Sequence, residues 1–257
     1  MGGILSKLLI DISFVGTAYC GYQVQPSSPT VQQELNNAAK KLFGFDCDIV
    51  GCSRTDSGVH ANHFCATVSQ KGMESLPTSI PLEKIPSALC FYLPEDISVM
   101  SATWVRDDFH ARYDVKYKEY LYCIWNAKQR DPFLHGRAWH YPKHIDDNAL
   151  EQMRLAAKKL EGTHDFSSYM AANSSVATTV RTVYKTDVYR EGNAIYFKVS
   201  ADGFLYNMVR IFTGTLISVA EGKISVDDID KITEVKDRSK AGITAPPQGL
   251  YLNKVVY

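Results

Sequence analysis

The order in which strand-type and helix-type patterns follow one another is the feature that most constrains the fold. Residues 7–14 alternate apolar and polar side chains, which is typical of a strand with one buried face. A helix is predicted from residue 31, because Thr30 and Gln33 have capping-box spacing and Gly44 follows the last apolar repeat. The residues predicted to be buried on these two elements are Leu8, Ile10, Ile12, Phe14, Val31, Leu35, Ala38, Ala39 and Leu42.

The rest of the first hundred residues continues this alternation. A strand is predicted around Ile49, another ends with the alternating Phe64, Ala66 and Val68, and a third covers 97–105. Between the last two, residues 81–93 read as a short helix with Pro86 in its first turn. The order strand, helix, strand, strand, helix, strand fits a ferredoxin-like unit.

The second part of the chain repeats this order loosely. We expect a long strand over 109–126, with Tyr120, Tyr122 and Ile124 on one face, and a hairpin that turns at 191–193. Helices are predicted at 146–162, 204–220 and 225–235, and a last strand at 249–257. Two like sheets could therefore lie side by side, with a cleft between them.

Composition indicates a globular intracellular protein. Of the 257 residues, 45% are hydrophobic and 22% are charged, so the chain can bury a core and is not expected to be disordered. No apolar run is long enough to cross a bilayer, and no signal peptide is expected. The six cysteines form no C-x-x-C pair, and the histidines lack metal-ligand spacing. We therefore expect reduced thiols, a cytoplasmic location and no metal site.

Charge gives two opposite indications about nucleic acid. The formal net charge is zero, whereas a nucleic-acid-binding protein usually has a basic excess. Residues 112–143 nevertheless combine basic side chains with many aromatic rings, which could bind phosphates and stack on bases. The same stretch also fits an amphipathic strand with a solvated face. The basic residues in it are Arg112, Lys116, Lys118, Lys128, Arg130, Arg137 and Lys143.

The stretch SRTDSGVH, residues 53–60, contains the first candidate for chemistry. Asp-Ser-Gly is common in turns, but Arg54 and His60 flank Asp56 on this loop. A nearby arginine keeps a carboxylate ionised, and an ionised Asp can act as a nucleophile or a base. Arg210, three residues after Asn207 on a predicted helix, is either a second cation for such a site or a surface arginine. His164 and Asp165 are expected to lie in a loop.

The segment CSRTDSGVHA closely resembles the signature G-R-T-D-A-G-V-H-A of the TruA family of tRNA pseudouridine synthases. Further segments match that family in the same order, so the resemblance covers nearly the whole chain. These segments are GTAYCGYQVQP, FHARYDVKYKEYLY, DPFLHGRAWHY, GTHDFSSY, VRTVY, GFLYNMVRIFTG and APPQGLYL. Ser53, Ser57 and Tyr22 stand where the family has Gly, Ala and Trp, and none of these differences removes a reacting group.

The resemblance implies an enzyme that isomerises uridine to pseudouridine in the anticodon stem-loop of tRNA, at positions 38, 39 and 40. It implies that Asp56 is catalytic and that Arg54 helps hold or replace the flipped nucleotide. Tyr120 would pack against the target base, and Arg210 would pair with Asp56. No cofactor or metal is implied.

The fold implied by the resemblance is α+β, with two ferredoxin-like halves, 1–108 and 109–257. Their antiparallel sheets would lie side by side around a central cleft, the Asp56 loop would belong to the first half, and the assembly would be a homodimer.

The chemistry leaves two routes open at this point. Isomerisation breaks the N1–C1′ bond of uridine, turns the base and rejoins it through C5. Asp56 could attack C1′, or it could remove the C2′ proton. Two other functions are compatible with parts of the sequence: a tRNA-binding or tRNA-refolding protein of the same fold without catalysis, and an unrelated hydrolase that uses Asp56 and His60.

Overall fold

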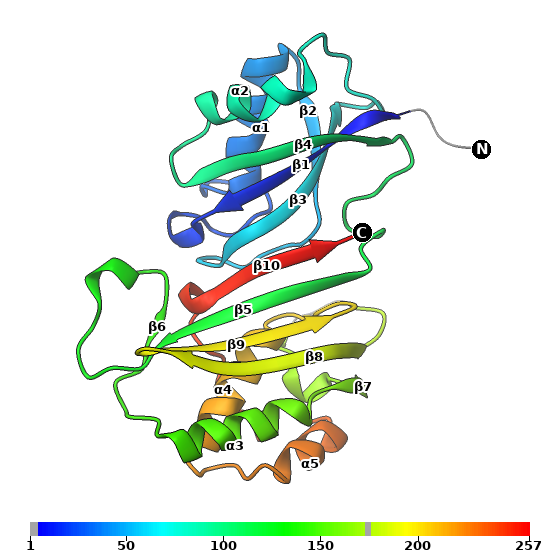
Figure 1. Ribbon diagram of the computed structural model, residues 1–257. Helices are drawn as coiled ribbons and strands as arrows, with labels where there is room; N and C mark the ends of the chain where they lie inside the picture. The colour runs from blue at the N-terminus through cyan, green and yellow to red at the C-terminus, as the bar shows by residue number, and fades with distance from the viewer. Residues whose placement is uncertain (1–4, 173–175) are drawn as a thin grey trace. The chain divides into compact units, whose positions relative to one another are not determined.

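The chain forms two compact units in a computed structural model that describes residues 5–172 and 176–257. Unit 1 extends from the N-terminus to Lys116 and also contains Leu252–Tyr257, whereas unit 2 is Tyr117–Tyr251 (Figure 1). The change from one unit to the other therefore comes eight residues after position 108. The division into halves 1–108 and 109–257, and a cleft between two sheets, stay predictions.

Unit 1 has the predicted order of elements. Its strands form an antiparallel sheet in the order β4-β1-β3, and β2 pairs with β3. Helices α1 and α2 pack on one face of this sheet (Figure 1). The strand order is that of a ferredoxin-like unit. The elements are β1 (Leu5–Phe14), α1 (Val31–Phe43), β2 (Cys47–Gly51), β3 (His60–Gln70), α2 (Ile85–Tyr92) and β4 (Ile97–Arg106).

The local signals that predicted α1 are confirmed in most respects. The Thr30 hydroxyl accepts a hydrogen bond from the Gln33 N–H at 3.3 Å, and Gly44 ends the helix with a φ of 80°. The Gln33 side chain instead donates to the Asn37 side-chain oxygen at 3.0 Å, so the reciprocal part of the capping box is replaced by a bond along the helix. The apolar face of β1 is buried as predicted, with Leu8 and Ile12 completely shielded.

Strand β10 (Leu250–Val256) contributes its last residues to unit 1. In the sheet it is the neighbour of β3, whose later residues, Ala66–Gln70, pair with β2. The Val255 N–H donates to Nδ1 of His63 at 3.0 Å, and the Asn62 side chain bonds that of Asn253 at 2.9 Å. Residues far apart in the sequence thus complete one sheet.

Unit 2 contains four antiparallel strands, one short parallel strand and three α-helices among its described residues. Its strands have the order β5-β9-β8-β7, and β6 pairs in parallel with the end of β5. Helices α3 and α4 pack against each other, α3 against β8 and α4 against β5 (Figure 1). The elements are β5 (Tyr117–Trp125), β6 (Trp139–His140), α3 (Asp147–Lys158), β7 (Gly162–Asp165), β8 (Val180–Glu191), β9 (Ala194–Ala201), α4 (Met208–Ala220) and α5 (Asp228–Val235).

The long strand predicted over 109–126 is shorter in the structure, and this part of the prediction is wrong. Residues before Tyr117 form a turn, in which the backbone N–H groups of Tyr113 and Asp114 both bond the His110 carbonyl. The Asp114 carboxylate accepts from the His110 N–H at 2.9 Å. These local bonds satisfy the backbone and compete with strand pairing.

Two other boundaries differ from the sequence prediction. Helix α4 begins at Met208 and not at residue 204, because Asn207 takes a left-handed conformation with a φ of 60°. His164 and Asp165, expected in a loop, belong to the edge strand β7 and pair with Arg181 and Val180 of β8. A strand of four residues is too short for a periodic pattern.

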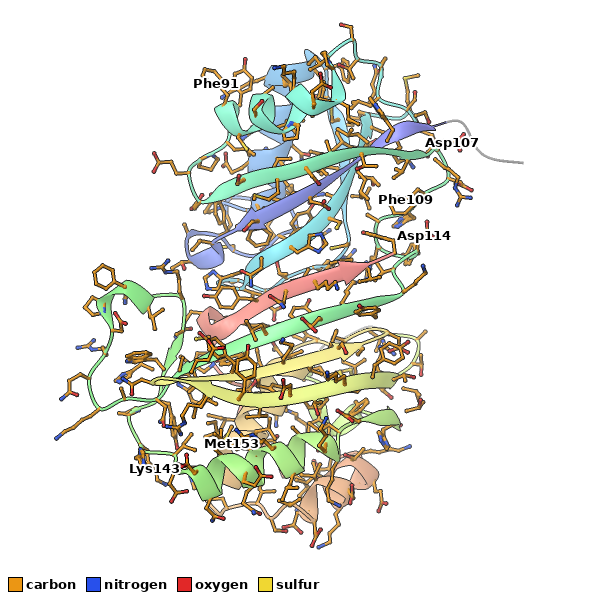
Figure 2. The ribbon with its side chains drawn as sticks, viewed as in Figure 1. Phe91, Asp107, Phe109, Asp114, Lys143 and Met153 are labelled. Carbon is orange, nitrogen blue, oxygen red and sulfur yellow. The ribbon has the colours of Figure 1, made fainter. Side chains whose placement is uncertain are left out.

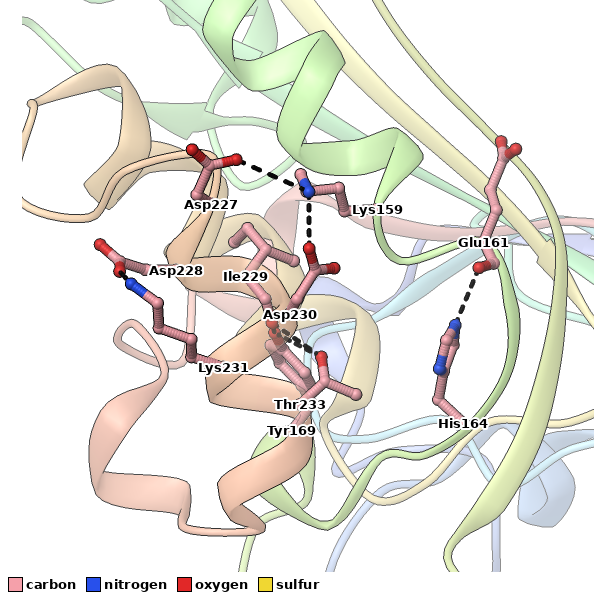
Figure 3. Close-up of polar contacts among 10 residues, drawn as sticks. All are labelled: Lys159, Glu161, His164, Tyr169, Asp227, Asp228, Ile229, Asp230, Lys231 and Thr233. Carbon is pink, nitrogen blue, oxygen red and sulfur yellow. Dashed lines mark hydrogen bonds and ion pairs between the residues drawn. The ribbon is translucent and has the colours of Figure 1, made fainter.

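Helix α5 is held to its surroundings by polar contacts. Lys159, just after α3, lies 2.5 Å from the Asp230 carboxylate and 3.7 Å from that of Asp227 (Figure 3). The Tyr169 hydroxyl lies 3.4 Å from the Thr233 hydroxyl, also on α5. Among the described residues, no helix is long and apolar enough to cross a membrane.

The contribution of the N-cap of α3 to stability can be tested by mutation. The Asp146 carboxylate accepts from the Ala149 N–H at 2.7 Å, whereas the equally exposed Asp147 caps nothing. We expect Asp146→Ala to lower the free energy of unfolding by about 1.5 kcal/mol and Asp147→Ala by only about 0.5 kcal/mol. Denaturant titration measures both, and equal losses would contradict the cap.

Candidate active site

Asp56 lies on the loop between β2 and β3, as the sequence predicted. Its carbonyl accepts from the Val59 N–H at 3.1 Å, and Gly58 has a φ of 76°. A four-residue turn with a glycine of positive φ in third place has type II geometry. The turn interpretation of Asp-Ser-Gly is therefore confirmed, and it is compatible with a functional carboxylate because the turn fixes the backbone of Asp56.

A second loop, residues 16–22, holds the Asp56 loop in place. The Tyr22 N–H donates to the Thr55 carbonyl at 3.1 Å, and the Gly58 N–H donates to the Tyr19 carbonyl at 3.2 Å. The Ser57 hydroxyl adds a bond to the same Tyr19 carbonyl at 3.3 Å. Backbone bonds on both sides of Asp56 thus restrict its position.

Two glycines permit this close approach of the two loops. A Cβ on Gly16 would lie 1.9 Å from the Val59 carbonyl oxygen, and one on Gly21 would lie 2.6 Å from that of Thr55. Gly21 also has a φ of 91°, a conformation that other residues adopt at a cost. The fully buried His60 completes the contact, because its Nδ1 accepts from the Gly16 N–H at 2.9 Å.

The family differences in this region fit the structure. The Tyr22 ring stacks on Phe64 with 4.3 Å between the ring centres, and Gly51 leaves room for it. Among the described residues, Ser53 is not one of those with positive φ, so its backbone does not require glycine. Burial raises the pKa of Tyr22, and its buried hydroxyl makes no hydrogen bond within the described residues.

The other predicted site residues divide between the units. Arg54 is exposed and shares the loop of Asp56 in unit 1. Tyr120 and Arg210 belong to unit 2.

In unit 2, Arg210 lies in the first turn of α4 and is half-buried. Its Nε donates to the Ala245 carbonyl at 2.7 Å and its Nη1 to the Asn207 side-chain oxygen at 2.6 Å. The side chains of Asn207 and Arg210 thus contact each other, although Asn207 precedes the helix. Two bonds orient the guanidinium group, which is unlike a surface arginine that moves freely.

Tyr120 lies on β5, with its ring edge-on to Phe204 and 4.9 Å between the ring centres. Tyr122, next on the same face, donates its hydroxyl to the Pro246 carbonyl at 2.5 Å. Burial raises the pKa of Tyr122, although the charge of Arg210 acts in the opposite direction. Tyr122 is therefore a neutral hydrogen-bond donor at neutral pH.

The segment 245–249 is a part of the site region that sequence reasoning missed. The sequence assigned it no side-chain partners, but its carbonyl groups at Ala245 and Pro246 accept from Arg210 and Tyr122. A Cβ on Gly249 would lie 2.6 Å from the Tyr122 ring. Its match to the family segment APPQGLYL was the available signal.

One group of side chains in unit 1 has the composition of a metal site. Asp11, His63 and Cys65 bring their possible ligand atoms within 4.8 Å of one another. Nδ1 of His63 already accepts from the Val255 N–H, so the ring proton of the neutral imidazole is on Nε2. A protonated Nε2 cannot bind a metal, and burial raises the pKa of the Cys65 thiol. The arrangement favours a hydrogen-bond network that joins strands of the sheet.

The family of the chain is shown by comparison with known proteins. A family model described as tRNA pseudouridine synthase matches residues 156–257. The tRNA pseudouridine synthase A of Thermoanaerobacter sp. (strain X514) is 46% identical over 255 residues, which cover 98% of this chain and 100% of the relative. That of Bacillus subtilis (strain 168) is 42% identical over 253 residues, covering 98% and 99%.

The chain belongs to the tRNA pseudouridine synthase A family. The resemblance seen in the sequence and the predicted enzyme class, a tRNA pseudouridine synthase, are confirmed. A solved structure, "Crystal Structure of a Cbf5-Nop10-Gar1 Complex", matches 95% of this chain and 57% of that chain at 12% identity. Its TM-score is 0.34, too low to support a statement about the fold.

The close approach at Gly21 predicts a specific loss of activity for this tRNA pseudouridine synthase. Gly21→Ala forces apart the two loops, and we expect kcat to fall about tenfold to a hundredfold because catalytic groups tolerate little displacement. Gly44→Ala is the matched control, since Gly44 has a φ of 80° with nothing within 4 Å of its Cβ position. It should lower stability by about 1 kcal/mol with kcat unchanged. Similar kcat values for both variants would contradict the role of the contact.

The Asp11 network predicts a pH dependence of stability. Hydrogen bonding from His63 is the largest influence that lowers the pKa of Asp11 from 3.8 to about 2. Its stabilising effect is therefore present above about pH 4 and is lost as the pH falls to about 2. Because the side chain is 32% exposed, we expect only about 1 kcal/mol. Wild type should lose this stability in acid denaturation curves, and Asp11→Asn should not.

Proposed function

We propose that the protein isomerises uridine to pseudouridine at positions 38, 39 and 40 of the anticodon stem-loop of tRNA, with Asp56 as the catalytic carboxylate. The observation that carries this proposal is the fixed loop of Asp56, which backbone bonds hold from both sides within a signature that matches the family. Catalytic groups need this kind of support, because they act only in a narrow range of positions. We also propose, from the family resemblance, a cytoplasmic homodimer.

The reaction is an isomerisation, so its atoms balance without an added reactant. The N1–C1′ bond breaks, the uracil turns, and a C5–C1′ bond forms; the hydrogen on C5 then leaves as a proton, and N1 gains a proton. Asp56 begins the reaction either by attacking C1′ or by removing the C2′ proton. Both routes require an ionised carboxylate close to the ribose.

The target uridine must leave the stacked stem before Asp56 can reach its sugar. Flipping costs a few kcal/mol, and stacking on an aromatic ring recovers part of this. We assign that ring to Tyr120, which Phe204 supports from its edge. Arg54, exposed on the same loop as Asp56, is assigned to the flipped nucleotide or to the space it leaves.

Arg210 is proposed as the cation that pairs with Asp56. Its bonds to Ala245 and Asn207 fix the plane of the guanidinium group, which suits it to orient a carboxylate. A fixed positive charge keeps a carboxylate ionised, as either chemical route needs.

The proposal predicts release of tritium from tRNA labelled at uridine C5. Wild type should release it, and Asp56→Ala should do so at least about a thousandfold more slowly, because loss of a covalent or general-base catalyst has effects of this size. Binding of the same tRNA by both proteins, measured by filter retention, is the control for folding.

The outcomes separate the candidate functions. A wild-type protein that binds the tRNA but releases no tritium acts as a tRNA-binding or tRNA-refolding protein on that substrate. Equal release by wild type and Asp56→Ala would remove Asp56 from the chemistry. Three tRNAs, each with uridine at only one of the positions 38, 39 and 40, test the assigned positions.

A further inference from the structure

A pocket of about 240 Å³ lies in unit 1 beside the Asp56 loop. One wall is the beginning of that loop, with Ser53 and Arg54, and another is the turn that follows β4, with His110, Arg112 and Tyr113. Figure 2 shows the backbone of this turn between Phe109 and Asp114.

The ionisable side chains that line the pocket are basic. Two arginines and a histidine line it, and no Asp or Glu is among the described residues of its wall. A larger pocket of about 910 Å³ in the same unit is different, because Asp48, Glu74, Asp107 and Asp108 line it. In a chain without net charge, the smaller pocket is thus a local concentration of basic side chains, although it shares His110 and three other wall residues with the larger pocket.

Contacts within the turn after β4 hold together the three residues of it that line the pocket. The backbone N–H of Arg112 donates to Nδ1 of His110 at 3.1 Å. In the neutral imidazole, the ring proton is therefore on Nε2. The Arg112 guanidinium carbon lies 5.9 Å from the Tyr113 ring centre, within cation–π range. Tyr113 is 74% exposed, so its ring is accessible to a ligand.

Tyr22 belongs to the wall of the pocket, but its hydroxyl is buried. Only 2% of the residue is exposed, and the hydroxyl makes no hydrogen bond within the described residues. A ligand in the pocket therefore does not reach this hydroxyl, and the case for an anion rests on the charged side chains of the wall.

We propose that this pocket binds a phosphate group of the tRNA backbone next to the uridine on which Asp56 acts. Arg54 and Arg112 supply the positive charge, and Tyr113 offers its ring to the attached nucleoside. The Cα of Arg54 is within about 7 Å of that of Asp56, because they are two residues apart. The inference rests on the proposed function, since it assigns the pocket to the same substrate.

Under this proposal, only part of the basic and aromatic stretch 112–143 binds the ligand of this pocket. Its first residues, Arg112 and Tyr113, line the pocket, whereas Tyr122 is completely buried on β5. Composition alone could not separate residues that face a ligand from residues that face the core.

Arg112→Ala and Arg112→Gln test the pocket, with Arg106→Ala as the matched control. Arg106 is exposed in the same unit but is 3.2 Å from the Asp108 carboxylate and does not line the pocket. Binding of tRNA is measured against salt concentration in proteins that also carry Asp56→Ala. We expect both Arg112 variants to weaken binding roughly tenfold and to reduce the slope of log affinity against log salt by about one. Arg106→Ala should change neither.

Turnover gives a second measurement. With Asp56 intact, the Arg112 variants should raise KM for tRNA about tenfold and leave kcat within about twofold, because the contact is equally present in ground and transition states. An unchanged affinity and salt slope in both Arg112 variants would overturn the assignment. The measurement of tRNA binding does not depend on turnover, so it tests the pocket even if the protein does not isomerise uridine.

Inorganic phosphate distinguishes the tRNA backbone from a free anion as the ligand. Phosphate replaces chloride at constant ionic strength, and it should weaken tRNA binding to wild type more than to Arg112→Ala. If phosphate binds at Arg112 but tRNA binding does not depend on Arg112, the pocket is a site for a free anion and the proposal is wrong.

Discussion

The contact between residues 16–22 and the Asp56 loop is the constraint on which the candidate site depends. Its hydrogen bonds join backbone groups at Tyr19, Tyr22, Thr55 and Gly58. Such bonds need close approach of two chains, and Gly16 and Gly21 provide it. The position of the carboxylate is therefore set by residues that carry no reactive group, which explains why two separate sequence segments are required for one candidate catalytic residue.

In unit 2, hydrogen bonds to backbone groups also orient the side chains of the candidate site. Arg210 and Tyr122 both donate to carbonyl groups of the segment 245–249, and Asn207 adopts a left-handed conformation while its side chain accepts from Arg210. A left-handed conformation costs a residue other than glycine some free energy, so its presence beside a candidate site residue indicates a functional constraint. In both units, irregular backbone fixes the polar groups.

The sequence predicted the regular elements well, because alternation on β1 and capping at Thr30 are local signals. It overextended β5, since the bonds around His110 and Asp114 that end the strand have no periodic signature. It missed β7, which is too short, and the acceptors at Ala245 and Pro246, because any residue has a carbonyl group. Asp56 could be selected as a loop carboxylate, but its role came from the family resemblance.

The contribution of Leu252–Tyr257 to unit 1 has a consequence for protein synthesis. The ribosome makes all of unit 2 before it makes the strand that completes unit 1. Domains usually fold in the order of their synthesis, but here the first unit must wait for contacts such as that between His63 and Val255. The part of β3 that β2 does not cover therefore lacks its β10 neighbour until the end of translation, and the Asp56 loop leads into that part of the strand.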